Sequence, residues 1–364
     1  MKIIRPTLIL DKQKCLKNIE MMSGKAWKHN LKFRPHFKTH QSAEIGDWFR
    51  EYGVNCITVS SVKMAEYFAD NGWNDITIAF PLNILEMEEI NKLTSKVNLN
   101  VIIISTESLL FLSERSKNKI GVYVKIDTGT HRTGILPEDK TLISSLLSEI
   151  KKHPNIIFKG FLAHTGHTYQ AKNKSEMEII HKEANNKLFE LRDLYKKDFE
   201  KIEISIGDTP SCSLLDDFNG IDEIRPGNFV FYDAMQYYIG SCGFDQIAVA
   251  LASPVVAKHP ERNEIIVYGG AVHLSKDYIE IGIVKSFGLA VMFEENKWSE
   301  PIKGVYVKSL SQEHGVIKID HNQDFFDKIK IGNVVGILPI HSCLTADLMK
   351  EYLTFEGERI GMMK

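Results

Sequence analysis

Cysteine is scarce in this sequence, with five among 364 residues, and the five are far apart. A small, odd number of distant cysteines does not suit a disulfide framework, so we expect reduced thiols and a cytoplasmic protein. Long apolar runs are missing too. The run before Asp11 is too short for the core of a signal peptide, and no segment approaches the roughly 18 apolar residues of a membrane helix.

A surplus of one charge is also missing, because 45 basic side chains are balanced by 47 acidic ones. We therefore expect no nucleic-acid partner and no membrane partner. Internal repeats, low-complexity stretches and Gly/Ser linkers are absent as well. The hydrophobic share of 43% is ordinary for a globular protein, and the length allows one large α/β barrel with a smaller domain.

What the sequence does contain, from residue 30 to about residue 230, is an alternation of short β-branched runs with longer amphipathic segments. Segments such as Ser61–Asn71 and Lys174–Lys197 carry apolar residues at spacings of three and four, which is typical of helices. Strand and helix repeated in turn favour a parallel (β/α)8 barrel, with an open doubly wound sheet as the alternative. The expected strands are 33–37, 55–59, 75–79, 99–104, 121–127, 156–163, 201–206 and 221–225.

Beyond about residue 245 helical periodicity disappears, and strand-like runs such as IAVALASPVVAKH, NEIIVYGG and NVVGILP are separated by turn residues. This pattern predicts a mainly antiparallel β domain, to which the early run TLILD can add a strand. We therefore expect a barrel over residues 12–240 and a second domain made of residues 1–11 and 241–364.

A lysine among histidines stands where the first barrel strand ends, in the segment RPHFKTH at 34–40. A side chain at this end of a strand can point into the barrel mouth, where burial and nearby cations lower the pKa of an amine and free it to attack an aldehyde. Lys38 is therefore a candidate nucleophile, although most lysines are simply solvated.

Two small polar turns follow the last two strands, GDTPS at 207–211 and IRPGN at 224–228. In barrels these two loops commonly bind phosphate, because glycine lets backbone N–H groups approach the oxygens closely. Thr209 can add a hydroxyl. Two ordinary turns are the alternative, but their position after consecutive strands favours a phosphate site.

Further polar residues follow the middle strands. The segment KIDTGTHRTG places Arg132 over the barrel mouth, where it could bond to a phenolate or carboxylate oxygen or form a structural ion pair with Asp127. The next strand ends in AHTGHTY, so that His164, His167 and Tyr169 share a loop. Each of these three is a possible base or ring-stacking partner.

In the β domain the segment PIHSC places His341 and Cys343 two positions apart. Residues at this spacing share a face of an extended chain, and two soft ligands fit an open metal site completed by water and substrate. A chance His-x-Cys pair is the alternative, and His314 is a possible third ligand.

These segments, in this order, resemble the fold-type III pyridoxal 5'-phosphate (PLP) enzymes, the alanine racemase-like barrels, and within them the D-serine dehydratase and D-threonine aldolase branch. The resemblance spans nearly the whole chain and rests on RPHFKTH, DTGTHRTG, AHTGHTY, GDTPS, IRPGN and HSC. It implies a homodimer that acts on a small D-amino acid, with PLP and a divalent metal as cofactors. Thiolate and imidazole ligands favour zinc.

The resemblance also implies roles for single residues. Lys38 forms the Schiff base, Arg132 approaches the phenolic oxygen, and Arg225 contacts the pyridine nitrogen with support from His164. Tyr169 could compete for that nitrogen. His341 and Cys343 bind the metal. The implied cofactor-binding residues are Lys38, Arg132, His164, Tyr169, Gly207, Thr209, Arg225, Gly227 and Asn228.

The implied activity is that of a lyase. Dehydratases of this branch show His-x-Cys where the aldolases tend to show His-x-Asp, so the sequence favours a dehydratase of a β-hydroxy D-amino acid, of the D-serine, D-threonine or 3-hydroxyaspartate type. Its products are a 2-oxo acid and ammonia. Retro-aldol cleavage to glycine and an aldehyde is the alternative, followed by an amino-acid racemase and a non-catalytic PLP-binding protein. His273 and Lys276 have no assigned role, and His167 stands where the dehydratases have asparagine.

Overall fold

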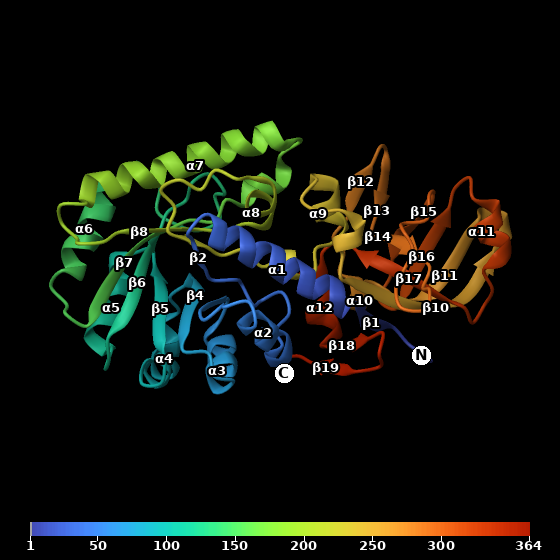
Figure 1. The fold of residues 1–364 in the computed structure, drawn as a ribbon, viewed down its shortest axis with the longest axis horizontal. Helices are drawn as coiled ribbons and strands as arrows, with labels where there is room; N and C mark the ends of the chain where they lie inside the picture. Colours follow the sequence, from blue (N-terminus) through green and yellow to red (C-terminus); the bar gives the residue numbers. More distant parts are fainter. Residues whose placement is uncertain (1) are drawn as a thin grey trace. The chain divides into compact units, whose positions relative to one another are not determined.

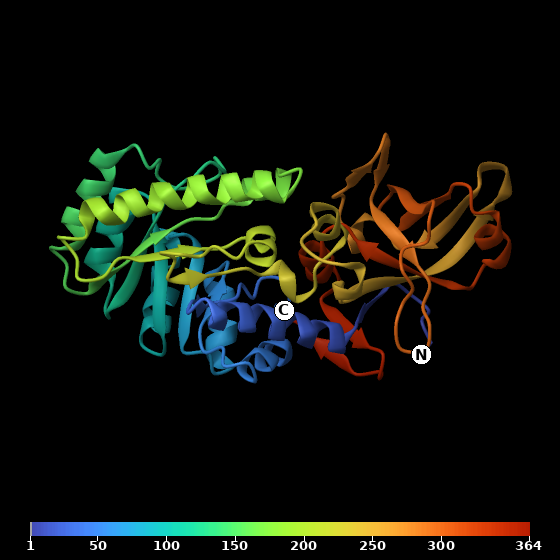
Figure 2. The same cartoon turned by 45° about the horizontal axis from the view of Figure 1, so that its top comes forward.

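The computed structural model describes residues 2–364, which form two compact units (Figures 1 and 2). The barrel unit contains residues 21–38 and 46–227, and the β unit contains residues 2–20, 39–45 and 228–364. The chain therefore changes unit at the peptide bonds Lys38–Thr39 and Gly227–Asn228, both of which lie in segments with candidate site residues.

The barrel unit has the eight parallel strands that the sequence predicts, in the order β2-β9-β8-β7-β6-β5-β4-β3. An isolated parallel bridge between His36 and Thr58 links the two edge strands. The strands are β2 (Lys32–Phe33), β3 (Ile57–Val59), β4 (Asp75–Pro81), β5 (Asn98–Ile103), β6 (Ile120–Lys125), β7 (Ile156–Leu162), β8 (Glu203–Ile206) and β9 (Glu223–Ile224).

Helices follow the strands as predicted, and side-chain caps mark where they begin. Ser61 and Ser105 accept a backbone N–H at the start of α3 and α5, which is the usual role of serine before a helix. The inner face of α3 buries Val62, Ala65 and Phe68. The helices are α1 (Lys12–Lys28), α2 (Ala43–Arg50), α3 (Val62–Asp70), η1 (Ile84–Glu86), α4 (Met87–Thr94), α5 (Thr106–Arg115), α6 (Lys140–Ile150), η2 (Gly166–Gln170), α7 (Lys174–Tyr195) and α8 (Thr209–Leu214).

The β unit is built on a nine-stranded sheet, in the order β11-β16-β15-β14-β17-β10-β1-β18-β19, with a separate hairpin of β12 and β13. Strand β1, from the predicted run TLILD, pairs antiparallel with β10 and parallel with β18. The other described pairs of the sheet are antiparallel. The strands are β1 (Thr7–Leu10), β10 (Val249–His259), β11 (Glu264–Tyr268), β12 (Ile279–Ile281), β13 (Val284–Ser286), β14 (Gly288–Val291), β15 (Val305–Leu310), β16 (His314–Ile319), β17 (Val334–Pro339), β18 (Glu351–Thr354) and β19 (Arg359–Gly361).

The predicted fold class is confirmed, and the β unit has one further feature that the sequence did not indicate. Helices do occur after residue 245, where the sequence showed no helical periodicity. Most are one to two turns long, too short to leave a periodic pattern. They are α10 (Ala271–Leu274), α11 (Gln323–Lys328) and α12 (Ser342–Met349), preceded by η3 (Asn228–Val230), α9 (Ala234–Ile239), η4 (Phe244–Gln246) and η5 (Pro260–Arg262).

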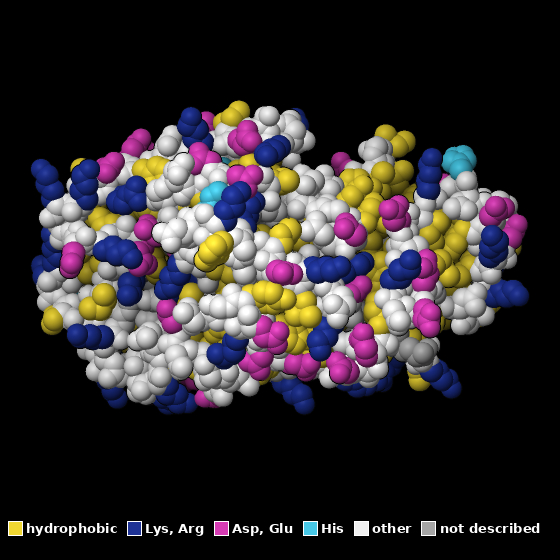
Figure 3. Space-filling view, in the orientation of Figure 1, with side chains coloured by type: hydrophobic (Ala, Val, Ile, Leu, Met, Phe, Trp, Pro, Cys, Tyr) yellow, Lys and Arg dark blue, Asp and Glu magenta, His cyan; other side chains and the backbone are white. Residues whose placement is uncertain are grey.

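The surface has the mixed charge that the composition predicts. Lys and Arg side chains alternate with Asp and Glu over the face shown in Figure 3, and no large area of one sign appears there. Among residues 2–364, no helix is long and apolar enough to cross a membrane.

Candidate cofactor and metal sites

Lys38 lies in the turn that follows β2. Its neighbour Phe37 donates a backbone hydrogen bond to Thr58 O (2.9 Å), and the Phe37 ring packs on Phe49, Phe68 and Trp73 at centroid distances of 5.0 Å. This aromatic packing fixes the turn in place. Lys38 itself is exposed at the carboxyl end of the parallel strands, where the sequence predicted it.

Four cationic side chains influence one another at this end of the barrel unit. Burial, followed by the charges of Arg132 and Arg225, lowers the pKa of Lys125 to about 8. Burial also lowers the pKa of His36 well below its usual range, with further contributions from Lys38, Arg225 and Arg132. A group of mutually repelling cations favours an anionic ligand. Lys125 is only 6% exposed, and the sequence analysis assigned it no role.

The ion pair between Arg132 and Asp127 that the sequence left open does not form. Asp127 Oδ1 instead accepts the backbone N–H groups of Gly129 and His131, both at 3.0 Å. Gly134 closes this turn with φ of +126°, and a Cβ atom there would lie 2.7 Å from Asp127 N. The carboxylate therefore shapes the loop and leaves the exposed Arg132 guanidinium available to a ligand.

The ends of β7, β8 and β9 bring three predicted residues together. His164 Nδ1 donates to Gly207 O (2.6 Å), so the proton is on Nδ1 and Nε2 can accept. Burial, helped by the charges of Lys38 and Arg132 and opposed by the bond to Gly207, lowers the pKa of His164 to about 3. Gly207 is required here, because a Cβ atom would lie 2.7 Å from the backbone of Arg225. His164 therefore serves as a neutral group beside Arg225.

The loop after β8 has the chemistry of a phosphate site. Asp208 Oδ1 accepts hydrogen bonds from Ser211 N (2.8 Å) and Thr168 Oγ1 (2.9 Å) at the start of α8. The hydroxyls of Thr209 and Ser211 are buried and have no hydrogen-bond partner within the described chain. Buried hydroxyls are normally satisfied, so these two fit a ligand with several acceptor oxygens, such as a phosphate ester. Gly227 is half-buried at the end of the neighbouring loop.

Tyr169 lies half-buried in η2, in a loop held by Thr130. Thr130 Oγ1 donates to His164 O (2.8 Å) and accepts from Gly166 N (3.0 Å). The His167 ring lies against Gly129, since a Cβ atom at that glycine would be 3.3 Å from the ring. The structure thus packs the two glycine-containing loops after β6 and β7 against each other.

The prediction that His341 and Cys343 share a face of an extended strand is wrong. β17 ends at Pro339, His341 is the N-terminal capping residue of α12, and Cys343 lies in its first turn. The two side chains still interact. Burial alone would lower the pKa of His341, but hydrogen bonds to Asp277 and Cys343 outweigh it and raise this pKa to about 11. The helix start, not strand alternation, brings imidazole and thiol together.

Asp277 is a candidate site residue that the sequence did not identify. Its Oδ2 lies 2.8 Å from His341 Nδ1, which leaves Nε2 of the ring for another partner. Metal-binding histidines commonly have such a carboxylate partner. The signal was the adjacent Lys276–Asp277 pair, but nothing in its local sequence connects it with His341.

Cys343 has neighbours from two segments of the β unit. Its Sγ lies 3.3 Å from Thr39 Oγ1 and 3.6 Å from Asn228 Nδ2. Asn228 also donates to Asp233 Oδ2 (2.6 Å), while its Oδ1 is buried without a partner within the described chain. The structure thus places the side chain of Asn228, a predicted phosphate ligand, beside the predicted metal ligand Cys343.

Within residues 2–364, no group of three or more His, Cys, Asp or Glu side chains is arranged to hold a metal. His314 is exposed in β16, opposite Tyr268, and does not complete such a group. His273 Nδ1 accepts from Gly270 N (3.1 Å) at the start of α10. His341, held by the carboxylate of Asp277, and Cys343 are two soft ligands. They fit an open metal site, in which the other ligands come from solvent or substrate.

Two family models match consecutive parts of the chain. The model of the alanine racemase N-terminal domain matches residues 10–234, and that of the serine dehydratase domain matches residues 248–355. The chain belongs to the alanine racemase N-terminal domain family. The predicted membership of the alanine racemase-like, fold-type III PLP barrels is thereby confirmed.

The relatives of this alanine racemase-like chain include dehydratases and aldolases, as predicted. D-serine dehydratase of Dictyostelium discoideum is 29% identical over 375 residues, which cover 95% of this chain and 91% of the relative. D-threo-3-hydroxyaspartate dehydratase of Delftia sp. (strain HT23) is 24% identical over 355 residues, with coverages of 95% and 93%. D-threonine aldolase of Arthrobacter sp is 22% identical over 348 residues, with coverages of 93% and 86%.

The solved structure of the Delftia dehydratase has the same fold. It superposes with a TM-score of 0.91 at 21% identity and covers 99% of this chain and 98% of its own. Solved variants of that enzyme include a cysteine-to-alanine variant in the metal-free form and a histidine-to-alanine variant.

Proposed function

We propose that this chain is a PLP- and metal-dependent lyase that converts a small β-hydroxy D-amino acid into a 2-oxo acid and ammonia. One observation carries the proposal. Lys38, the candidate cofactor lysine, is bonded to Thr39, whose hydroxyl lies 3.3 Å from the thiol of Cys343, a candidate metal ligand. A candidate cofactor residue and a residue that contacts a candidate metal ligand are thus consecutive in the sequence, which supports a function that uses both PLP and a metal.

The barrel residues fit PLP. The amine of Lys38 would bond to its aldehyde, and the unpartnered hydroxyls of Thr209 and Ser211 would hold its phosphate. PLP, when bound, supplies an electron sink that acidifies the substrate Cα–H bond. The amine of Lys38 would be the base that accepts that proton. Arg225 donates hydrogen bonds but does not lose its proton. The positive charge that it would place beside the cofactor ring therefore stays constant.

His341 and Cys343 fit a metal with open coordination positions. His341 would bind through Nε2, because Nδ1 is held by Asp277. Imidazole and thiolate together favour zinc. A divalent metal supplies positive charge for a departing hydroxyl group. In the Delftia dehydratase the substituted histidine and cysteine are likewise two positions apart, and one variant is metal-free, which supports a metal at His341 and Cys343.

A retro-aldol lyase is the second candidate, because a D-threonine aldolase is among the relatives. The same residues would serve, but the substrate hydroxyl would lose its proton and Cα–Cβ would break. Cys343 favours the dehydratase, since the aldolases tend to have aspartate at this position.

The products decide between the two reactions. The purified protein, loaded with PLP and zinc, is incubated with D-serine, D-threonine and D-threo-3-hydroxyaspartate, and ammonia, 2-oxo acid, glycine and aldehyde are measured. We expect ammonia and 2-oxo acid in equal amounts, and their loss after treatment with a chelator while the visible colour of bound PLP persists. Faster formation of glycine and aldehyde would overturn the proposed dehydratase reaction. Full activity after metal removal would overturn the proposed metal dependence.

We also propose a cytoplasmic homodimer. None of the five cysteines forms a disulfide bond within residues 2–364, in keeping with a reducing compartment. Two exposed apolar side chains are available to contact a second copy of the chain. They are Ile283, fully exposed at the tip of the β12–β13 hairpin, and Trp27 on α1, which is 86% exposed. Light scattering should give twice the chain mass of 41.5 kDa, and a monomer at micromolar concentration would contradict the dimer.

A further inference from the structure

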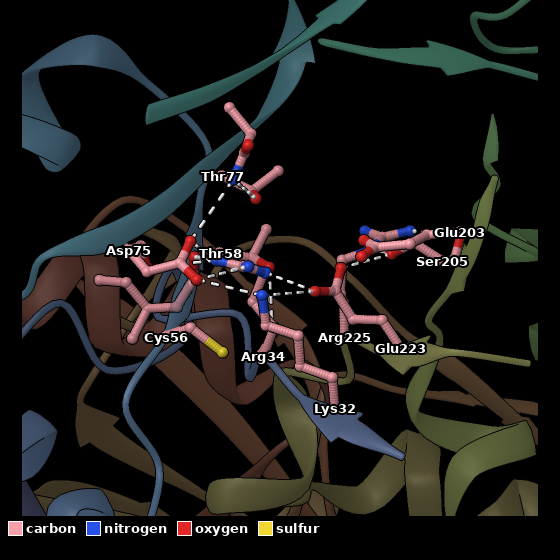
Figure 4. A network of polar contacts seen from close by, with 12 residues as sticks. Lys32, Arg34, Cys56, Thr58, Asp75, Thr77, Glu203, Ser205, Glu223 and Arg225 are labelled. Atoms are coloured by element: carbon pink, nitrogen blue, oxygen red, sulfur yellow. Dashed lines mark hydrogen bonds and ion pairs between the residues drawn. The ribbon is translucent and has the colours of Figure 1, made fainter. Parts of the chain in front are cut away.

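A row of buried polar side chains crosses the interior of the barrel unit and ends at Arg225 (Figure 4). Arg34, 1% exposed, donates from Nε to Glu223 Oε2 (2.6 Å) and from its terminal nitrogens to Asp75 (2.7 and 3.1 Å). Ser205 Oγ donates to Glu223 Oε1 (2.6 Å) and accepts from Arg225 Nε (2.7 Å). A single hydroxyl group thus joins Glu223 to Arg225.

Strand pairing fixes this arrangement. Glu223 and Arg225 are two positions apart at β9, so their side chains lie on the same face. Ser205 of β8 is the direct partner of Glu223 in the parallel register. Arg34 follows β2, whose Phe33 is paired with Ile224. The backbone ladder therefore places all four side chains in the barrel interior, without help from flexible loops.

The two arginines of the row differ in how their charges are balanced by carboxylates. Arg34 has two carboxylate partners, one of which, Asp75, also lines a cavity of about 360 Å³ with Tyr123 and Glu203. Arg225 forms no ion pair within residues 2–364, and its other acceptors are the carbonyls of Ala163 (2.7 Å) and Ser205 (3.4 Å). Burial lowers the pKa of Arg225, and the charge of Glu223 opposes this. Glu223 is thus the main balancing charge for Arg225, acting through Ser205.

We propose that Ser205 and Glu223 are positioning residues that hold the guanidinium of Arg225 in one orientation and thereby bias the reaction toward elimination. The inference rests on the proposed function and on the predicted contact of Arg225 with the cofactor ring. Without the Ser205 hydroxyl, Arg225 Nε–H and Glu223 Oε1 both lose a partner while buried. The guanidinium then moves toward Glu223 to regain one, and its hydrogen bonds to a ligand weaken.

The test compares the parent protein with Ser205→Ala and Ser205→Thr, the second of which keeps the hydroxyl. Two quantities are measured: the dissociation constant of PLP from the cofactor-free protein, and the ratio of α-proton exchange in ²H₂O to ammonia release. For Ser205→Ala we expect the dissociation constant to rise about fivefold, as for the loss of one hydrogen bond, and the ratio to rise about tenfold. Ser205→Thr should restore both.

Ser286→Ala is the matched control, because Ser286 is also fully buried and its hydroxyl also makes a hydrogen bond, to Gly288 O (3.0 Å) in the β unit. It should lower the melting temperature without changing the exchange ratio. Glu223→Gln keeps the acceptor oxygen but removes the charge, and should change the ratio in the same direction as Ser205→Ala. This second variant keeps the proposal testable if Ser205→Ala does not fold.

The outcomes separate the inference from the function on which it rests. A Ser205→Ala protein that keeps the parent's PLP affinity and exchange ratio overturns the inference alone. An unchanged ratio in Glu223→Gln overturns the role of the carboxylate. A parent protein that takes up no PLP overturns the proposed function and the inference together.

Discussion

His341 Nδ1 lies 2.8 Å from Asp277 Oδ2, although 64 positions separate the two residues in the sequence. The contact fixes the ring orientation and directs Nε2 away from the carboxylate. It also makes the ring more electron-rich, which strengthens binding of a cation.

Asp277→Asn should therefore weaken metal binding. Partner carboxylates of this kind contribute about 10- to 100-fold to metal affinity, and we expect a loss of at least about tenfold. The zinc dissociation constant is measured by competition with a chromogenic chelator. Asp324→Asn, on α11, should leave zinc affinity and PLP binding unchanged. Equal zinc affinity in Asp277→Asn and the parent would mean that His341 does not bind the metal through Nε2.

Lys38→Ala should abolish the chromophore that borohydride reduces. Lys38 follows the first barrel strand at its carboxyl end, where barrel enzymes carry out their chemistry. The measurement is mass spectrometry of tryptic peptides after reduction, with Lys63→Ala on the exposed face of α3 as the control. A reduced PLP adduct on Lys125 in the parent protein would assign the cofactor to this buried lysine instead of the exposed Lys38.

Gly207→Ala should disturb both stability and cofactor binding. The added Cβ atom would lie 2.7 Å from the backbone of Arg225, which has no room to yield because its N–H group donates to Ile206 O of β8 (2.8 Å). Overpacking of this kind costs about 1–3 kcal/mol. Urea unfolding gives the free energy, and reconstitution with PLP gives the affinity. Gly361→Ala, where a Cβ atom meets nothing within 4 Å, is the control. An undiminished free energy of unfolding in Gly207→Ala would contradict the tight packing of β8 on β9.

Acid should destabilise the folded protein through His40. Its ring is fully buried and accepts a hydrogen bond from Ser42 N on Nδ1 (3.2 Å), and burial lowers its pKa from 6.5 to about 3. Between these two values the unfolded chain binds the proton and the folded chain does not, so stability falls as the pH falls below about 6.5. From pH 7.5 to pH 5.5 the contribution of one such histidine is about 1 kcal/mol.

The measurement is the free energy of unfolding in urea at both pH values. His40→Gln should reduce the loss at pH 5.5 by about 1 kcal/mol relative to the parent. His321→Gln, at an exposed histidine, should not. An identical pH dependence in His40→Gln and the parent would show that His40 is not the group responsible.

Much of the barrel could be predicted from the sequence because its signals are local. The helix predicted over Lys174–Lys197 occurs as α7 (Lys174–Tyr195), with Asn173 as its cap. Strand β2 is shorter than predicted and ends at Phe33, because Pro35 lacks the N–H group needed to continue a ladder. The candidate residues at strand ends followed from the same logic, since the carboxyl ends of parallel strands meet at one edge.

The parts that could not be predicted depend on contacts between distant segments. Asp277 meets His341 across a fold that no local pattern specifies. The extended geometry assumed for His341 and Cys343 failed because β17 ends two residues earlier and α12 begins. Glu223 and Ser205 had no visible role, since their meeting depends on the register of β8 and β9.

The position of β1 has a consequence for biosynthesis. Its four residues pair with β10 (Val249–His259) and with β18 (Glu351–Thr354), both of which are synthesised much later than β1. On the ribosome, this first strand therefore waits unpaired while residues 46–227 of the barrel unit emerge in one continuous stretch. Its shortness, with Arg5 before it and Asp11 after it, limits the risk of aggregation during this wait. The sheet of the β unit therefore cannot be completed until β18 has left the ribosome.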